Sequence, residues 1–282
     1  MMTYKIVSDS SCNMFSLEHI PFENVPMKIR TDNKEYVDDT KLDKVGMMND
    51  LLKYKGKSGT ACPSVGEWLD AFGDNDVVFG VTITSNLSGS YNSAVDAMHL
   101  FAETYPDKKC HIVDTLTAGP EQDLCVEKLQ ELMMAGKSFE EIRAEISEYI
   151  KSTHLLFSLE SLKNLANNGR TSQVVAAMAG ILGIRLVGKA SDHGTLEPMH
   201  KCRGEKKALE TIYNEMKNNG YQGGRVRIGH SLNLNAAETL KAMICKDHPT
   251  ADISIIDHSG LCCFYSEKGG ILVGYEGAKK FD

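Results

Sequence analysis

The sequence contains few of the patterns that hold metals or build covalent frameworks. Its eight cysteines form no Cys-x-x-Cys pair, and no two of its nine histidines stand three or four residues apart. These absences argue against a disulfide framework and against a zinc site. Cys262 and Cys263 are adjacent, and in the strand that we expect there they would point to opposite faces. We expect no metal and no cofactor.

The chain also has no run of about 18 uninterrupted apolar residues, so no transmembrane helix is indicated. Its first residues, MMTYKIVSDSS, lack the basic and then apolar layout of a secretory signal. A Gly-x-Ser-x-Gly motif, which presents the nucleophile in many serine hydrolases, is missing as well. We expect a cytoplasmic protein that does not insert stably into membranes and has no nucleic-acid partner.

What is present is the composition of an ordinary globular protein, with 42% hydrophobic and 24% charged residues. The length of 282 residues allows one large domain or two smaller ones. The net charge of −7 is uneven, because residues 1–152 contain 15 Lys and Arg against 25 Asp and Glu, and residues 153–282 contain 16 against 13. The positive second half suggests an anionic ligand or partner there, and a solvated surface of mixed charge is the open alternative.

Strands and helices alternate from residue 1 to about 150. Short apolar strands are indicated at 5–7, 76–83 and 110–113, a hairpin at 25–37, and helices at 43–54, after 64, at 121–135 and after 138. The helices after 64 and 138 each begin with a capping box, Ser64 with Glu67 and Ser138 with Glu141. This alternation predicts a mostly parallel sheet covered by helices.

The order of elements is mixed after residue 152. Strands are predicted at 154–159, 181–190, 195–200, 225–230, 253–256, 261–264 and 271–275, and helices at 205–217 and 235–244. We therefore expect two α/β domains, residues 1–152 with the inserted hairpin and residues 153–282 with a mixed sheet. A ligand site is expected in the cleft between them.

The stretch from Val81 to Ala94, VTITSNLSGSYNSA, runs from an apolar strand through small hydroxylated residues into a helix. The helix is expected to begin near Ser88 or Ser90, where free backbone N–H groups favour a carboxylate or phosphate. A purely structural role for Ser88 as a helix cap is the local alternative. A second hydroxyl, Thr60, stands in an extended loop before Pro63, and Ser8 to Ser11 follow the first strand at the end where such sheets bind ligands.

In their order and spacing, several such segments resemble the DegV family of bacterial fatty-acid-binding proteins. The matching segments are Ser8-Asp9-Ser10-Ser11, Thr60-Ala61-Cys62-Pro63-Ser64, Thr84 to Tyr91, Val113-Asp114-Thr115, Leu162 to Arg170, Asp192-His193-Gly194 and Arg203. The resemblance implies two α/β domains with a long-chain fatty acid buried between them. It places the carboxylate on Thr60 and Ser88, with Gly89 allowing a close backbone approach and Ser85 and Asn86 in the same loop.

The resemblance also implies a partner, a fatty acid kinase that acts on the bound acyl group, with Arg170 and Arg203 docking on it. One segment departs from the family pattern, which has a His-x-Gly-Pro-Gly turn near the end whose histidine contacts the carboxylate. Here Tyr265 and Ser266 stand at that turn, and Ser266 replaces the histidine. The acyl tunnel is expected to be lined by apolar residues of both halves, with Val174 to Leu186 as a candidate segment.

Two other functions stay open at this level. A serine-dependent acyl hydrolase would use Ser88 with His230 and Asp9. Alternatively, the protein is a regulatory interaction module in which the lipid is structural. The binding protein is favoured because the candidate site contains hydroxyls and N–H groups but no obvious base, and because about 15 methylenes at ~0.8 kcal/mol each give a large gross driving force. We expect no enzymatic activity.

Overall fold

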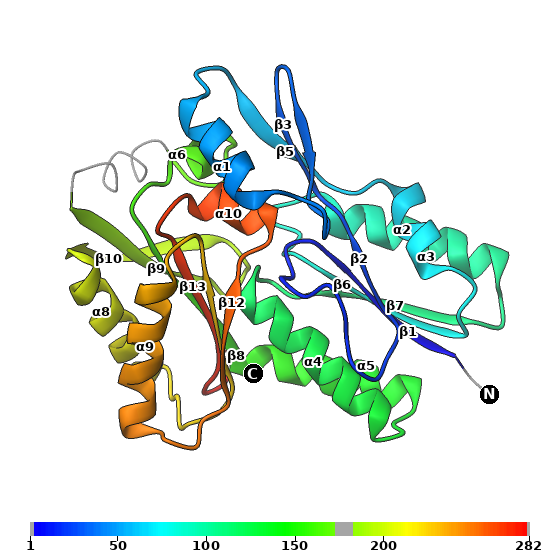
Figure 1. Ribbon diagram of the computed structural model, residues 1–282. Helices are drawn as coiled ribbons and strands as arrows, with labels where there is room; N and C mark the ends of the chain where they lie inside the picture. The colour runs from blue at the N-terminus through cyan, green and yellow to red at the C-terminus, as the bar shows by residue number, and fades with distance from the viewer. Residues whose placement is uncertain (1–2, 173–182, 281–282) are drawn as a thin grey trace.

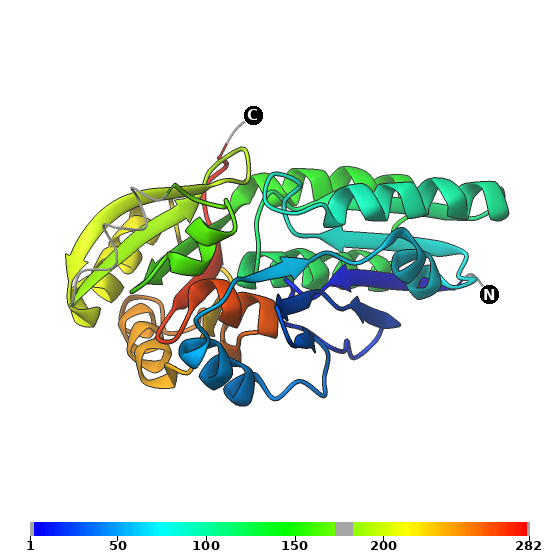
Figure 2. The ribbon, with the colours of Figure 1, turned by 90° about the horizontal axis from the view of Figure 1, so that it is seen from above.

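The computed structural model describes residues 3–172 and 183–280, which form two sheet-and-helix layers side by side with a smaller sheet above them (Figures 1 and 2). The three sheets contain four, six and three strands. The first is parallel and the second is mixed, which confirms the predicted α/β fold class.

The four-stranded sheet has the order β2-β1-β6-β7, and all of its strands are parallel. The strands are β1 (Tyr4–Asp9), β2 (Phe22–Val25), β6 (Val77–Thr82) and β7 (Lys109–Asp114), and the helices are α2 (Val65–Phe72), α3 (Ser90–Thr104), α4 (Pro120–Met134) and α5 (Phe139–Tyr149). In β6, one of the two central strands, Val78 packs in the core under α2 and α3, whereas Phe79 packs in the core under α4 and α5. Burial on both faces explains why β6 is a continuous apolar run. Both predicted capping boxes are present.

The six-stranded sheet has the order β10-β9-β8-β13-β11-β12, in which β11 and β12 are parallel and the other neighbours antiparallel. The strands are β8 (Thr153–Leu159), β9 (Ile184–Ala190), β10 (Leu196–Arg203), β11 (Val226–His230), β12 (Ile253–Asp257) and β13 (Ile271–Glu276). Helices α8 (Glu205–Asn218) and α9 (Leu234–Asp247) close a core on one face. The 3-10 helix η1 (Ile150–Ser152) leads directly into β8. We propose residues 1–152 and 153–282 as the two domains.

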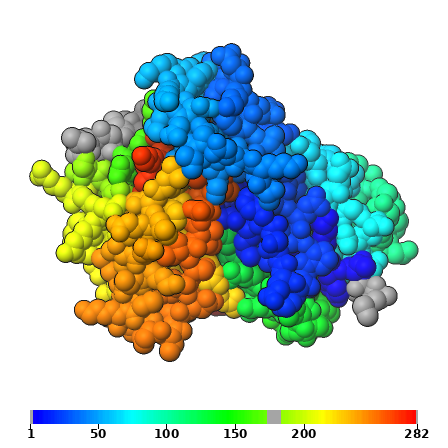
Figure 3. All heavy atoms as spheres, viewed as in Figure 1, coloured from blue at the N-terminus to red at the C-terminus, as the bar shows by residue number. Residues whose placement is uncertain are grey.

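The third sheet is an antiparallel insertion with the order β4-β3-β5. Its elements are β3 (Lys28–Thr31), β4 (Glu35–Val37), β5 (Ser58–Ala61) and the intervening helix α1 (Lys44–Lys53). The predicted hairpin is confirmed, but the segment around Thr60, expected to be a loop, is a strand that pairs with β3. The insertion lies directly against the orange and red C-terminal residues (Figure 3), because α1 and β3 share a core with a short helix of the second half.

That short helix, α10 (Gly260–Ser266), corrects the prediction of a strand at 261–264. Its first turn is organised by Ser259, whose hydroxyl accepts a hydrogen bond from the backbone N–H of Cys262 at 3.4 Å. A short apolar run has no periodicity that separates a strand from a buried helix, so the local sequence was ambiguous. Cys262 and Cys263 are consequently neighbours on a helix and do not lie on opposite faces of a strand.

Residues of the N-terminal half hold the first turn of α10. The Asp38 carboxylate accepts hydrogen bonds from the N–H groups of Gly260 at 2.5 Å and Leu261 at 2.8 Å, and Asn13 Oδ1 accepts one from Ser259 N at 2.9 Å. These bonds satisfy N–H groups that every helix leaves free at its start. Burial raises the pKa of Asp38 to about 6, although the bonds from Leu261 and Gly260 and the nearby Lys44 act in the other direction.

We expect Asp38→Asn to flatten the pH dependence of stability between pH 4 and 6. The folded protein keeps the Asp38 proton up to about pH 6 and the unfolded chain releases it near 3.8, so the folded state binds more protons in this range. The parent's free energy of unfolding therefore falls as pH rises, by an upper limit of about 3 kcal/mol from this group, and the asparagine variant lacks that part of the slope. Urea unfolding of both proteins at several pH values measures the difference. Parallel stability profiles would contradict the assignment.

The remaining boundaries agree with the predictions to within a few residues, and α6 (Lys163–Asn167) is short. The predicted apolar segment 174–182 lies outside the described residues. Among residues 3–172 and 183–280, no helix combines the length and apolarity needed to cross a membrane. Within the same ranges, no cluster of three His, Cys, Asp or Glu side chains has the arrangement of a metal site.

Candidate functional site

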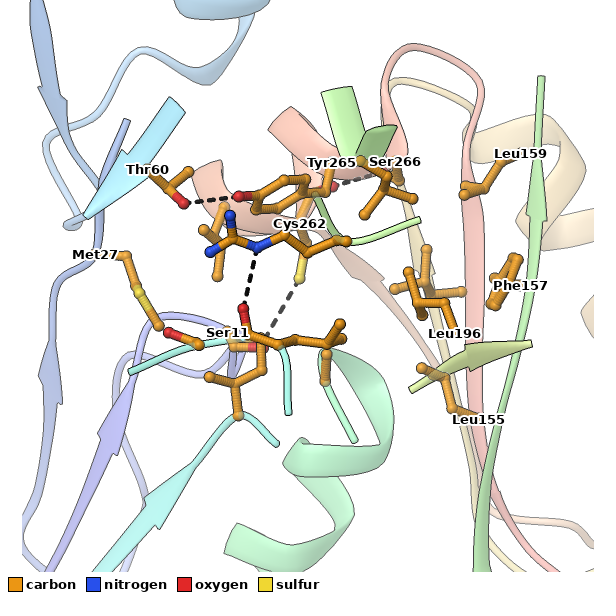
Figure 4. A pocket seen from close by; sticks show the side chains of 18 residues that line it. Ser11, Met27, Thr60, Leu155, Phe157, Leu159, Leu196, Cys262, Tyr265 and Ser266 are labelled. Atoms are coloured by element: carbon orange, nitrogen blue, oxygen red, sulfur yellow. Dashed lines mark hydrogen bonds between the residues drawn. The ribbon is translucent and has the colours of Figure 1, made fainter. Parts of the chain in front are cut away.

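A cavity of about 700 Å³, counted to its mouth, is lined by residues of both halves of the chain (Figure 4). Its walls come from β8, β10 and β13 of the six-stranded sheet, from α6 and α10, from β5 of the insertion and from loops of the N-terminal half. Segments that are far apart in the sequence therefore meet at one site.

One side of the cavity is apolar. Leu155, Phe157 and Leu159 are alternate residues of β8 and point the same way, and Leu196 of β10 and Leu272 of β13 continue the wall. Figure 4 shows Leu155, Phe157, Leu159 and Leu196 grouped on the side away from Thr60. The two-residue period of a strand explains why every second residue of β8 faces the cavity.

The opposite side carries the polar groups. The lining there includes four hydroxyl-bearing residues, two of them from α10, and one guanidinium, in addition to Ser11 and the Cys262 thiol. These residues are Thr60, Ser88, Arg170, Tyr265 and Ser266. The cavity thus has hydrogen-bond donors at one end and hydrocarbon at the other.

Thr60 and Tyr265 meet across the two halves. Their hydroxyl oxygens are 2.7 Å apart, and Figure 4 shows the bond from β5 to α10. Burial raises the pKa of the Tyr265 phenol, so the hydroxyl keeps its proton at neutral pH. The two hydroxyls have one hydrogen each. One hydrogen forms the bond between Thr60 and Tyr265, and the other can be donated to a ligand.

Ser88 lies in the loop between β6 and α3. Its oxygen accepts a hydrogen bond from Ser90 N at 3.3 Å, and the residue in the cap position of α3 is Gly89, which has no side-chain capping bond. The helix therefore begins at Ser90, the second of the two predicted starts. Because Ser88 lines the cavity and its hydroxyl hydrogen is not needed for that bond, it can donate to a ligand.

Ser266 ends α10 with its side chain nearly fully buried, 3% exposed. Its hydroxyl donates to the carbonyl oxygen of Cys262 at 2.6 Å. A Cβ on Gly270 would lie 2.5 Å from the Ser266 carbonyl oxygen and 2.6 Å from its Cβ, so the turn after α10 closes on Ser266 only with glycine there. The turn thus fixes Ser266 against the cavity although it lacks the family histidine.

Arg170, which the resemblance assigns to partner docking, lies in the cavity lining. Its Nε donates to the carbonyl oxygen of Leu87 at 3.1 Å and one terminal nitrogen donates to Asn168 O at 2.5 Å. The guanidinium carbon is 5.9 Å from the centroid of the Tyr265 ring. A cation next to the hydroxyls makes this end of the cavity suitable for an anion.

Comparison with known proteins decides the family. The sequence profile of the DegV family matches residues 3–276. The chain belongs to the DegV family. A DegV domain-containing protein of Streptococcus pneumoniae is 43% identical over 279 residues, which cover 98% of this chain and 99% of that protein.

Two solved structures are similar to this DegV-family protein over nearly its whole length. One is a DegV family protein from Eubacterium eligens loaded with heptadecanoic acid, with 44% identity, a TM-score of 0.96, and coverage of 98% of this chain and 100% of that one. The other is the Streptococcus pneumoniae fatty acid kinase (Fak) B3 protein loaded with linoleic acid, with 43% identity, a TM-score of 0.96, and coverage of 98% and 99%. The resemblance inferred from the sequence motifs is confirmed.

Several residues that the DegV resemblance points to lie outside the lining. Ser85 donates its backbone N–H to Asp114 at 3.1 Å, and the Asn86 amide donates to His193 O at 2.6 Å, so both brace the loop that carries Ser88. Gly89 has φ of −71°, which any residue adopts, and Arg203 is exposed at the end of β10. In the described part of 174–186, Leu186 packs with Phe157 and Leu159 in a core cluster and does not line the cavity.

The residues of the hydrolase alternative are not assembled in this DegV-family protein. The Asp9 carboxylate accepts from Ile83 N at 3.0 Å and Ser90 Oγ at 2.6 Å, and His230 Nε2 lies 3.4 Å from Asp257 Oδ1. Among the described residues, no hydrogen bond or ion pair links Ser88 to His230 or Asp9. Ser88, His230 and Asp9 therefore make separate structural contacts and do not form a catalytic triad.

Ser11, which the sequence places at the ligand-binding end of the first strand, lines the cavity. Two other buried residues were not predicted as part of the site: Cys262 lines the cavity, and His258 is hydrogen-bonded to Ser231, the neighbour of Ser266. One local signal for His258 was available, because His258-Ser259-Gly260 has the His-x-Gly spacing that begins the family turn. No local pattern marks Ser231, which reaches Ser266 only through the pairing of two loops.

Proposed function

We propose that this protein binds one long-chain fatty acid, with the acyl chain along the leucine and phenylalanine wall and the carboxylate at the end that contains Thr60 and Ser88. The observation that supports this most directly is the separation of the cavity into an apolar wall and a donor-rich end. Similar proteins that carry heptadecanoic acid and linoleic acid support it independently.

The physical reasoning treats the two ends separately. Burial of each methylene against the apolar wall contributes ~0.8 kcal/mol, so affinity comes mainly from the tail. A buried carboxylate without partners would be strongly unfavourable, and the hydroxyls of Thr60, Ser88 and Tyr265 with the Arg170 guanidinium supply donors and a positive charge. The polar end therefore determines the class and orientation of the ligand.

The deciding experiment is extraction of the purified protein with organic solvent followed by mass spectrometry. We expect about one long-chain fatty acid per protein molecule. The delipidated protein should then take up added palmitic acid with the same stoichiometry. A protein that contains no lipid and binds none after addition would overturn the proposed function.

We expect Thr60→Val and Ser88→Ala each to weaken fatty-acid binding roughly tenfold, because each removes a hydrogen bond to a charged group worth about 1.5 kcal/mol. Titration with palmitic acid measures the dissociation constants. The matched control is Ser85→Ala, since Ser85 is in the same loop but does not line the cavity. Unchanged affinity in the double variant at 60 and 88 would place the headgroup elsewhere.

We further propose that the protein presents its bound acid to a fatty acid kinase and that Arg170 and Arg203 contribute to docking. The kinship to the Fak B3 protein supports a kinase partner, and Arg203 is exposed beside Lys201, Lys206 and Lys207, all exposed as well. Arg170 lines the cavity beside Thr60, Ser88 and Tyr265, so the group that a kinase would modify would lie close to this side chain.

Arg203→Ala is expected to leave fatty-acid affinity unchanged and to lower acyl phosphate formation with a purified partner kinase, because this side chain is remote from the lining. Lys217→Ala, at the other end of α8, serves as the control for a simple loss of positive charge. Arg170→Ala should lower both binding and transfer. Equal turnover in the Arg203 variant and the parent would remove Arg203 from the docking surface, and a bound acid that never exchanges with deuterated acid would favour a module in which lipid is structural.

A further inference from the structure

A chain of hydrogen bonds leads from the cavity into the core of the second half. The Ser266 and Ser231 hydroxyl oxygens are 2.6 Å apart, and Ser231 Oγ is 2.9 Å from His258 Nδ1. Ser231 and His258 are fully buried, and of the three residues only Ser266 lines the cavity. The imidazole therefore has access to the cavity only through two serine hydroxyls.

Counting hydrogens gives the direction of this chain. The one hydroxyl hydrogen of Ser266 goes to Cys262 O at 2.6 Å, so its oxygen accepts from Ser231. That uses the one hydrogen of Ser231, whose oxygen must then accept from His258, and Nδ1 carries the ring proton. The adjacent Cys263 thiol donates to the His258 carbonyl oxygen at 3.6 Å, and its sulfur also lies within hydrogen-bonding reach of Ser231.

The other ring nitrogen does not decide the tautomer. His258 Nε2 is buried, and among the described residues it has no hydrogen-bond partner. The backbone at Gly229 packs directly against this nitrogen, since a Cβ there would lie 2.2 Å from Nε2. Within the part of the chain that the structure describes, Nε2 has no partner in either tautomer, so the choice rests on Nδ1, where a proton completes the serine chain. Burial, with smaller effects of His230 and Lys44, lowers the pKa of His258 to about 3, so the ring is neutral.

We propose that His258 is a positioning residue for the fatty-acid headgroup, because its Nδ1–H, relayed by Ser231, leaves the Ser266 hydroxyl able only to donate. When a carboxylate enters, the Ser266 hydroxyl rotates from Cys262 O toward the ligand. His258 Nδ1–H, the Ser231 hydroxyl and the Ser266 hydroxyl then all donate in the direction of the cavity. Hydrogen bonds in such a row polarise one another, which makes the last donor stronger. This inference rests on the proposed function, and it explains how a serine serves at the place of the family histidine.

The tautomer is tested first, on the ligand-free protein. The ¹⁵N chemical shifts of the His258 ring are expected to show a protonated Nδ1 and an unprotonated Nε2 at pH 7. A proton on Nε2, or on both nitrogens, would overturn the proposal. This measurement does not depend on whether the protein binds fatty acids.

The second test compares His258→Asn with His258→Leu, since an asparagine amide retains an N–H near the position of Nδ1 and leucine does not. Dissociation constants are measured for palmitic acid and for hexadecanol, which has the same tail and no charge. We expect His258→Leu and Ser231→Ala to weaken binding of the acid about fivefold to tenfold and of the alcohol less than twofold, with His258→Asn within twofold of the parent. His258→Leu added to Ser266→Ala should have no further effect.

Equal losses in the asparagine and leucine variants, or equal losses for acid and alcohol, would overturn the role of His258. Should His258→Leu fail to fold, Ser231→Ala and the ¹⁵N shifts still decide. A parent protein that binds no palmitic acid would instead refute the proposed function, so the two failures are distinguishable.

Discussion

Lys280→Ala is expected to lower the free energy of unfolding by about 3–5 kcal/mol, because it leaves the buried Glu121 carboxylate without its cation. Lys280 Nζ is 2.8 Å from Glu121 Oε1, and the two side chains are 6% and 0% exposed. The same carboxylate oxygen accepts from Thr153 Oγ1 at 2.8 Å, while among the described residues Oε2 has no partner.

Chemical denaturation of the parent and variant measures this loss. Lys279→Ala is the matched control, since its ion pair with Glu148 has side chains 59% and 55% exposed, and we expect a change below about 1 kcal/mol. A double variant, Lys280→Met with Glu121→Leu, should recover most of the lost stability because no charge remains buried. Equal effects of the substitutions at 279 and 280 would contradict the expectation.

The position of this pair gives it a consequence for function. Glu121 is in the first turn of α4, whose backbone lies so close to β13 that a Cβ on Gly274 would be 2.4 Å from Glu121 N. The cavity is built from both halves, so its shape depends on this packing. We therefore expect Lys280→Ala to weaken fatty-acid binding only under conditions in which it also loosens the fold.

Shortening the ligand from palmitic acid to decanoic acid is expected to weaken binding by roughly 10³-fold to 10⁴-fold. Six methylenes are removed, and at ~0.8 kcal/mol each the loss approaches 5 kcal/mol if the longer chain lies fully against the apolar wall. Titrations with a series of even-numbered acids below their micelle concentrations give the increment for each added pair of methylenes.

Two variants separate the ends of the site in this series. Thr60→Val should weaken all chain lengths by the same factor, because it changes only the headgroup contact. Leu155→Asn, in the β8 wall, should weaken long chains more than short ones, since only long chains cover the introduced amide. Affinity that is independent of chain length in the parent would show that the tail does not occupy the wall.

Much of the site was predictable because its parts carry local patterns. Ser88 stands where an apolar strand passes into a helix, and Thr60 stands before Pro63, which requires an extended backbone. Both line the cavity, as do Tyr265 and Ser266. Their use as carboxylate ligands stays a prediction. Arg170 shows the limit of such reasoning, since its motif identified the residue but not the cavity into which its side chain folds.

Local sequence was enough to predict the alternation of strands and helices, the two capping boxes, the hairpin and the hydroxyls of the candidate site, because each depends on residues within a few positions of one another. The helix at 260–266 and the connection of His258 to the cavity depend instead on long-range packing. The bond between Asp38 and Leu261 N joins residues 223 positions apart, and the contact of Ser231 with Ser266 spans 35. Such contacts exist only once the sheets have paired and the two halves have packed, and local periodicity contains no information about them.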